Sequence, residues 1–169
     1  MVVAAALWNG LRGRELPLLG ESPAVGVALG LGAAALTFAL GILVYRLIPA
    51  MRRIAEELAP SVVDGARMRD LMLVSVFSGV GEEALFRGAV QQEFGLVVAA
   101  VAFGVLHVGP DRRYLLWTAW ALLAGFLFGW LFLVTGGLLA PVLAHVLHNA
   151  ATFALWKHVR ERGKDAGPG

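Results

Sequence analysis

Several side chains that could carry out chemistry lie inside the most apolar parts of this 169-residue sequence. The first group is Glu82-Glu83-Ala84-Leu85-Phe86-Arg87. Glu83 and Arg87 are four residues apart, so on a helix they share a face and can form an ion pair. Glu82 lies ~100° around the helix from Glu83, which leaves its carboxylate free to act as a general base. The alternative is that all three charges form an ion-pair network between helices.

Two further groups contain histidine. Phe103 and His107 lie near the end of one apolar segment, and His145 and Asn149 lie four residues apart in another. His145 and Asn149 therefore point the same way on a helix, with His148 on the flank of that face. An imidazole can carry a proton, and a carboxamide is a neutral donor that can hold an oxyanion. The alternative for His107 is a hydrogen-bonded helix end, and for His145 and Asn149 it is hydrogen bonding between neighbouring helices.

Together these groups could hold and activate a water molecule. Glu82 would accept its proton, His107 would position the water or relay the proton, and His145 and Asn149 would stabilise a tetrahedral oxyanion. This predicts peptide hydrolysis without a covalent intermediate, because no Gly-x-Ser-x-Gly sequence and no cysteine supplies a nucleophile. Zinc or another divalent metal on Glu82, His107 and His145 is the alternative way to hold the water. No His-Glu-x-x-His zinc helix is present.

The composition predicts that these residues lie in a membrane. Hydrophobic residues make up 59% of the chain and charged residues 15%, against ~25% charged residues in an average soluble domain. This argues against a soluble cytosolic domain, a disordered chain and a nucleic-acid binder. Three runs have no charged residue: 24 residues from Ser22, 17 from Phe94 and 43 from Tyr114.

The fold class predicted from these runs is an all-α polytopic membrane bundle. We expect five membrane helices, since ~20 helical residues cross the hydrocarbon core, near residues 23–45, 70–92, 95–108, 114–134 and 137–157. The third is short for a span. Thr135-Gly136-Gly137 should separate the last two. The polar segment 49–69 is either a linker or an interfacial helix with an apolar stripe of Ile54, Leu58 and Val62.

The distribution of Lys and Arg predicts how the chain is oriented. With five spans, eleven of the fourteen basic residues fall on one side, in the segment 46–69, the loop 109–113 and the tail. That side should be cytoplasmic. The expected organisation is an N-terminal lead-in (1–22), one membrane-embedded domain (23–157) and a cytoplasmic tail (158–169) that is frayed. Pairs of glycines four residues apart, Gly26 with Gly30 and Gly125 with Gly129, favour close helix packing.

The polar groups resemble the motifs of one known family. Glu-Glu-x-x-x-Arg, Phe-x-x-x-His and His-x-x-x-Asn follow one another here at residues 82–87, 103–107 and 145–149. Their order, spacing and placement in apolar segments are similar to those of the CPBP intramembrane proteases, the CAAX proteases and bacteriocin-processing enzymes also called the Abi family. The resemblance covers roughly residues 70–155 and implies a membrane endopeptidase with an interior active site.

The resemblance also implies roles for single residues. Glu82 matches the usual catalytic glutamate, and His107, His145 and Asn149 match the water-holding and oxyanion positions. Glu83, Arg87 and Phe103 match motif positions that support the site. His148 lies outside the motifs and is expected to contact the catalytic residues rather than the substrate. Both a glutamate-type mechanism and a metal-dependent one fit the motifs. The implied partner is a peptide or protein substrate, lipidated or otherwise membrane-bound.

Two other functions compete with proteolysis. Some members of the resembling family are scaffold or bacteriocin-immunity proteins, so a proteolytically silent member would bind a partner through the same residues. A small proton-coupled transporter is the third, because Glu and His inside membranes also form proton relays. No inverted repeat is visible in the sequence, which weighs against the transporter.

Overall fold

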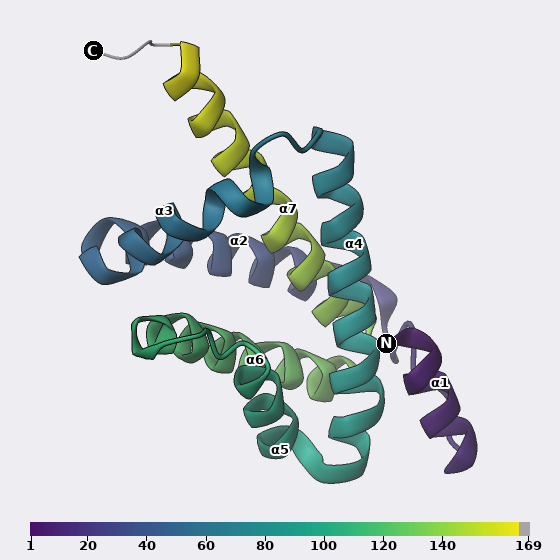
Figure 1. Ribbon diagram of the computed structural model, residues 1–169. Helices are drawn as coiled ribbons and strands as arrows, with labels where there is room; N and C mark the ends of the chain where they lie inside the picture. The colour runs from purple at the N-terminus through teal and green to yellow at the C-terminus, as the bar shows by residue number, and fades with distance from the viewer. Residues whose placement is uncertain (166–169) are drawn as a thin grey trace.

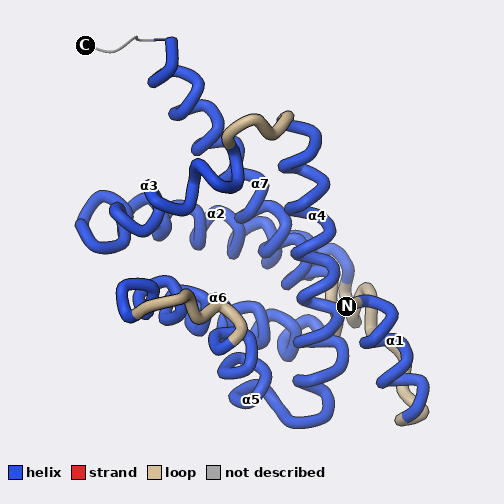
Figure 2. The backbone as a smooth tube through the Cα atoms, in the orientation of Figure 1, coloured by secondary structure: helices blue, strands red, loops and turns tan. Residues whose placement is uncertain are grey.

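The computed structural model describes residues 1–165, and in this part of the chain it contains helices and connecting loops without a strand. Figures 1 and 2 show that helices cross one another throughout the molecule. In chain order the elements are α1 (Val2–Leu11), α2 (Pro23–Leu47), α3 (Pro49–Val63), α4 (Met68–Leu85), the π-helix η1 (Phe86–Val90), α5 (Gln91–Val105), the 3-10 turn η2 (Arg112–Tyr114), α6 (Leu115–Thr135) and α7 (Leu139–Asp165).

Four stretches of the described chain are long and apolar enough to span a membrane: Pro23–Leu47, Met68–Val105, Arg112–Thr135 and Leu139–Gly163. The expectation of an all-α polytopic bundle is confirmed, with four such stretches where about five spans were expected. The second stretch contains both of the helices expected at 70–92 and 95–108, which meet in a turn at Gly95 (φ 85°, ψ 170°). Residues 96–105 rise only ~15 Å, so this arm is too short to cross a ~30 Å core alone.

The other helix boundaries agree with those predicted from the sequence, with one exception. Gly136 ends α6 in the left-handed conformation (φ 67°), at the break that the sequence predicts. The last helix, however, continues past residue 157 to Asp165. The expectation of a frayed tail is therefore wrong up to Asp165, since Arg160 pairs with Asp64 and holds this part of α7 against the turn after α3. Residues 166–169 of the expected tail lie outside the described residues.

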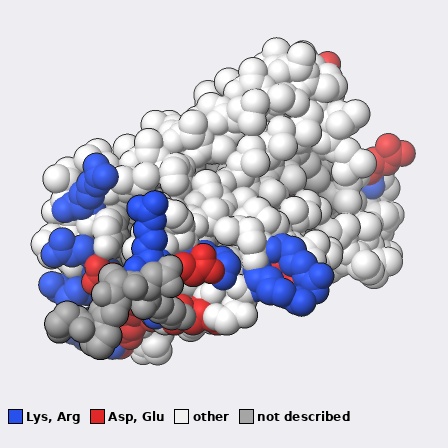
Figure 3. Space-filling model, turned by 90° about the horizontal axis from the view of Figure 1, so that it is seen from above, with Lys and Arg blue, Asp and Glu red and all other residues white. Residues whose placement is uncertain are grey.

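The three basic segments meet at one end of the bundle. Lys157 Nζ donates to the Ala66 carbonyl at 2.8 Å, and the Tyr114 hydroxyl donates to Glu57 Oε1 at 2.8 Å. These contacts join the end of α7, the loop before α6 and α3. In Figure 3 the Lys and Arg side chains gather, with acidic ones among them, toward the same end. We call it the basic end.

Helix α3 forms within the polar segment that the sequence left as linker or interfacial helix. Its buried face consists of Ile54, Ala59 and Val63. Val62 is 40% exposed, so the predicted stripe of Ile54, Leu58 and Val62 is only partly the buried face. The segment packs against α2, α6 and α7 and covers the basic end of the bundle.

The N-terminal segment packs around the π-helix at the opposite end. Asn9 is 1% exposed, and its amide donates to the carbonyls of Ala5 at 3.0 Å and Gly88 at 2.6 Å. Arg12 and Arg14 both pair with Glu93. Helix α1 therefore fixes the position of η1, which carries part of the polar cluster described below.

Glycines allow the close helix crossings that the sequence predicts. A Cβ atom at Gly30 would lie 2.8 Å from the Ala140 carbonyl oxygen, and one at Gly125 would lie 3.2 Å from Ala100 Cα. At Gly79 a Cβ would lie 2.6 Å from Val146 Cγ2, which shows how tightly α4 crosses α7. These crossings bring the polar side chains of α4, α5 and α7 within reach of one another.

Replacing Gly30 by alanine should separate α2 from α7. The added methyl has no room against the Ala140 backbone, so we expect a loss of about 1–3 kcal/mol of stability. Thermal unfolding of the purified protein in detergent measures it. Gly32→Ala, on the same helix with nothing within 4 Å of the new Cβ, is the control and should leave the midpoint unchanged or slightly higher. Equal midpoints for both variants would contradict the predicted crossing.

Candidate active site

A carboxylate without solvent contact lies at the centre of the polar cluster. Glu83 and Arg87 are each 0% exposed, and Arg87 Nη1 donates to Glu83 Oε1 at 2.9 Å. The same oxygen accepts from His145 Nδ1 at 2.7 Å. The pair expected from the i,i+4 spacing is present, and α7 contributes a third member to it. Removing one partner of such a buried pair leaves an uncompensated charge, so the stability of the protein depends on all members being present.

Arg87 also binds helix α6. Its Nη2 donates to the Gly125 carbonyl at 2.8 Å, and one turn later Gln91 Nε2 donates to the Gly129 carbonyl at 2.8 Å. The glycines leave these two backbone oxygens uncovered by side chains. The guanidinium carbon of Arg87 lies 4.7 Å from the centre of the Phe103 ring, a cation–π contact. The arginine thus joins four helical segments at one point.

The π-helix η1 begins at Phe86, three residues after Glu83. Its wider turn is closed by the Gln91 N–H, which donates to the Phe86 carbonyl five residues earlier. Single π-helical turns inside α-helices occur frequently at functional sites. Here the turn contains Arg87 and separates Glu82 and Glu83 from the arm that leads into α5.

Glu82 lies outside this network and approaches His107. Glu82 Oε2 is 3.9 Å from His107 Nε2, and their side chains are 18% and 27% exposed. Since a carbonyl only accepts, His107 Nδ1 carries a hydrogen and donates it to the Phe103 carbonyl at 2.7 Å. Glu82 Oε2 is buried and has no hydrogen-bond partner among residues 1–165. Two polar atoms therefore face each other across a gap too long for a direct hydrogen bond.

Phe103 connects the two histidines and the arginine. Its ring centre lies 4.5 Å from that of His107, 6.0 Å from that of His145 and 5.1 Å from that of Phe86. It is 3% exposed. The phenylalanine of the second motif is thus the ring against which the other side chains are packed.

The loop that follows His107 is anchored at the basic end. Thr118 Oγ1 donates to the His107 carbonyl at 3.2 Å. Asp111 caps the 3-10 turn by accepting from the Arg113 backbone N–H at 2.8 Å. Hydrogen bonds from the Arg113 side chain hold the pKa of Asp111 below its usual value. These contacts fix the turn from which His107 extends.

Asn149 is held by a residue that sequence reasoning missed. Its amide nitrogen donates to Ser78 Oγ at 3.2 Å. Ser78 is on α4, one turn before Glu82, so the spacing alone could have placed it on the same side of the helix as the glutamate. A serine in an apolar helix was an unremarkable feature of the sequence, because serine commonly bonds its own backbone.

His148 does not join the cluster. Its ring centre is 6.2 Å from that of Trp120, and it lines a separate cavity between α2, α6 and α7. Helix α7 turns the His148 side chain away from that of His145. Among residues 1–165, His148 therefore makes no contact that would support the site.

Comparisons with known proteins identify the family. Residues 65–151 match the model of the family described as type II CAAX prenyl endopeptidase Rce1-like. The chain belongs to the Rce1-like family. It is also 32% identical over 100 residues to YpbD of Bacillus subtilis (strain 168), described as an uncharacterized protein, covering 56% of this chain and 51% of that protein. The chain thus spans about half the length of this relative. No solved structure matches it.

Membership identifies this Rce1-like protein as a multi-pass membrane protein of a peptidase family. The match begins at residue 65 and ends at residue 151, so it contains α4, η1, α5, α6 and the part of α7 that carries His145 and Asn149. The polar cluster lies entirely inside the matched region, which is where a site common to the family would be found.

A divalent metal is the alternative way for this Rce1-like protein to hold the water. Among residues 1–165 no group of three or more His, Cys, Asp and Glu side chains could hold a metal ion. Of the set considered from the sequence, Glu82 and His107 approach each other, but His145 turns its Nδ1 to Glu83. A carboxylate that accepts from Nδ1 is compatible with a metal ion on Nε2, so the metal stays an alternative and no step below involves one.

Arg87→Met should destabilise the protein strongly. It leaves the buried Glu83 carboxylate without its cation, and breaking such a pair typically causes a loss of about 3–5 kcal/mol. The change is measured by thermal unfolding in detergent. Adding Glu83→Gln to Arg87→Met should restore part of the stability, because the uncompensated charge is then absent.

Glu82→Gln is the matched control for this network. Glu82 Oε2 has no hydrogen-bond partner within residues 1–165, so its neutral analogue should unfold at a temperature close to that of the wild type. A large loss of stability in Glu82→Gln, or none in Arg87→Met, would contradict the division between a structural and a free glutamate.

Proposed function

We propose that this protein is an intramembrane endopeptidase that hydrolyses a peptide bond with a water molecule held by Glu82 and His107. The observation that carries the proposal is the 3.9 Å gap between Glu82 Oε2 and His107 Nε2. One of these atoms is buried without a hydrogen-bond partner among the described residues. Two polar atoms that face each other beyond direct hydrogen-bond distance can be joined by a water molecule, and a small widening of this gap would admit one.

The tautomer of His107 determines how such a water would be oriented. Because Nδ1 donates to the Phe103 carbonyl, Nε2 of the neutral ring is an acceptor, like the Glu82 carboxylate. The water would donate one hydrogen to each acceptor. Its lone pairs would then be directed away from both side chains, toward a substrate carbonyl carbon. This is the orientation that a nucleophilic water needs.

In the proposed reaction Asn149 stabilises the intermediate. One of its two N–H groups is engaged by Ser78, which leaves the second available for an oxyanion. His145 Nδ1 donates to Glu83, so Nε2 could help only when it also carries a hydrogen. We therefore assign the oxyanion chiefly to Asn149 and treat His145 as a second donor positioned by Glu83.

The proposed reaction is balanced by one proton carried on Glu82. The water oxygen bonds to the carbonyl carbon while Glu82 takes a proton from the water. The tetrahedral oxyanion then collapses, the carbon–nitrogen bond breaks, and Glu82 returns the proton to the leaving amine. The products are a carboxylic acid and an amine, and the protein is regenerated without a covalent intermediate.

We further propose that the basic end faces the cytoplasm. The segments that carry most of the Lys and Arg residues contact one another there, and such residues are enriched in cytoplasmic loops. His107 lies in the turn at that end of α5, so the substrate would be a membrane-bound or lipidated peptide or protein reached from the cytoplasmic side.

Glu82→Gln should abolish proteolysis while leaving the protein folded. The amide cannot take up the proton, so we expect a loss of at least about a hundredfold. Peptide termini in the membrane fraction are compared between cells that express wild-type protein and cells that express Glu82→Gln. Termini produced only by the wild type would locate the cleavage site and provide candidate substrates.

Glu15→Gln is the matched control, because Glu15 is exposed and lies in the N-terminal segment away from the cluster. It should give the wild-type termini. Identical termini for wild type and Glu82→Gln, at equal protein amounts, would contradict proteolysis and favour a scaffold or immunity protein that uses the same fold.

Substitutions of Asn149 and of Ser78 should lower kcat by different amounts. Asn149→Ala removes an oxyanion donor and should lower kcat about 100-fold to 1,000-fold. Ser78→Ala removes only one hydrogen bond to that donor and should lower kcat by about tenfold or less. The rate is measured on a substrate identified by its termini. If Ser78→Ala were as damaging as Asn149→Ala with no loss of stability, the positioning role would be contradicted.

A further inference from the structure

A second cavity lies apart from the acid and histidine cluster. It has a volume of about 360 Å³ and is bounded by α2, α3, α6 and α7. Neither Glu82, His107 nor Asn149 lines it. Its volume lies within the range of about 300–1,000 Å³ that is typical of ligand pockets. The proposed peptidase chemistry makes no use of this space.

Aromatic and aliphatic side chains form most of its wall. Trp117 and Trp120 come from α6, and Trp156 comes from α7. The ring of Trp156 meets that of Tyr45 edge to face at 5.5 Å, which joins α7 to α2 beside the cavity. Tryptophan and tyrosine are enriched where the hydrocarbon core meets the headgroups. The composition of this wall is therefore typical of a site near the membrane interface.

The cavity is widened at its inner end by a glycine. A Cβ at Gly41 would lie 3.9 Å from the Trp120 ring and 4.0 Å from His148 Cε1. The absence of a side chain on α2 keeps space open between this helix and the two rings. His148 Nδ1 is buried there without a hydrogen-bond partner among residues 1–165. The wall is apolar around one polar atom, as is usual for ligand pockets.

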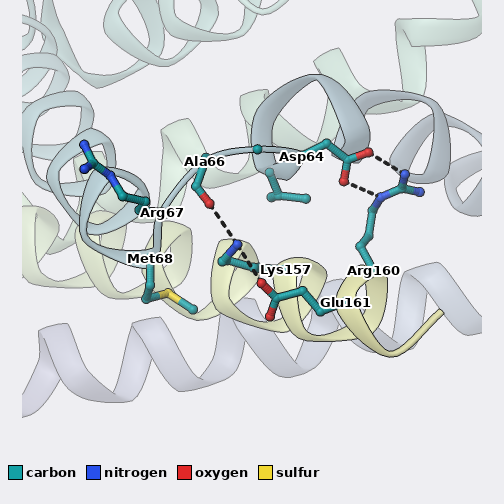
Figure 4. A pocket seen from close by; sticks show the side chains of 9 residues that line it. Asp64, Ala66, Arg67, Met68, Lys157, Arg160 and Glu161 are labelled. Carbon is teal, nitrogen blue, oxygen red and sulfur yellow. Dashed lines mark hydrogen bonds and ion pairs between the residues drawn. The ribbon is translucent and has the colours of Figure 1, made fainter. Parts of the chain in front are cut away.

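An unpaired arginine marks the outer end. Arg46, at the end of α2, lines the cavity, is exposed and makes no ion pair with residues 1–165. A neighbouring cavity of about 580 Å³ at the same basic end differs in this respect. Figure 4 shows that Lys157 there contacts Ala66 and Glu161, and that Arg160 contacts Asp64. The charge of Arg46 is thus available to an anion, whereas those cations are already paired.

We propose that this cavity binds one acyl chain of an anionic phospholipid, with the phosphate at Arg46. The apolar wall lies within helices long enough to span a membrane, its aromatic rings are of the kind enriched at the headgroup level, and the free cation complements a phosphate. Arginines at the ends of membrane helices attract anionic headgroups in this way. The chain extends from the basic end toward Gly41 and His148.

The test measures lipid binding to the purified full-length protein by native mass spectrometry. The probes are phosphatidylglycerol and phosphatidylcholine with identical acyl chains. We expect the wild type to prefer phosphatidylglycerol. Gly41→Phe fills the cavity and should weaken phosphatidylglycerol binding by about tenfold or more, since burial of several methylene groups is lost. Gly32→Phe, on the exposed part of α2, is the matched control and should bind like the wild type.

Arg46→Gln tests the contribution of the lipid headgroup separately from that of the acyl chain. It should reduce the preference for phosphatidylglycerol by about fivefold and leave phosphatidylcholine binding unchanged. Unchanged phosphatidylglycerol binding by both Gly41→Phe and Arg46→Gln would overturn the proposal. Displacement of bound lipid by a neutral isoprenoid alcohol, but not by phosphatidylglycerol, would also overturn it and identify a different ligand.

A second measurement uses only the wild-type protein and so does not depend on whether a variant folds. Phosphatidylglycerol with a brominated acyl chain, in detergent micelles, should quench the fluorescence of the tryptophans that line the cavity. Unbrominated phosphatidylglycerol should reverse the quenching at concentrations at which phosphatidylcholine does not. Equal reversal by the two lipids would contradict a site that selects the anionic headgroup.

Discussion

The charge of Glu83 is the constraint on which the rest of the structure depends. A carboxylate at 0% exposure inside a membrane bundle has to be compensated from within the protein. Arg87 supplies the compensating charge and His145 the second hydrogen bond, so the π-helix and α7 must meet α4 at this one oxygen. Arg87 in turn needs the Gly125 carbonyl, which fixes the approach of α6. A single buried charge thereby specifies the relative positions of the helices that carry the site.

This arrangement separates the two adjacent glutamates by role. Glu83 is occupied by structural contacts, whereas Glu82, one residue earlier, faces a different direction and meets His107. Phe103 packs against His107, His145 and Arg87 and so lies between the two groups. A rigid network beside a carboxylate without a protein partner is the physical basis for the proposed water-activating role. Preorganised polar groups in an apolar interior act more strongly than the same groups in water.

Local features of this fold were predictable from the sequence, and contacts between distant segments were less so. The Glu83–Arg87 pair follows from i,i+4 spacing, and the charge-free runs predict the long helices. The turn at Gly95, which shortens the third helix, has no signal beyond one glycine among 21. The hydrogen-bond partner of His145 depends on how α4 crosses α7, and the spacing of residues within one helix does not determine that crossing. The same is true of the Ser78–Asn149 contact.

The most direct test of this account is an experimental structure in a lipid phase, at a resolution that shows ordered water. The account predicts a water molecule within hydrogen-bond distance of both Glu82 Oε2 and His107 Nε2, with Glu83 bound to Arg87 and His145. A Glu82 carboxylate hydrogen-bonded directly to Arg87, or a metal ion coordinated by Glu82 and His107 in place of the water, would contradict it.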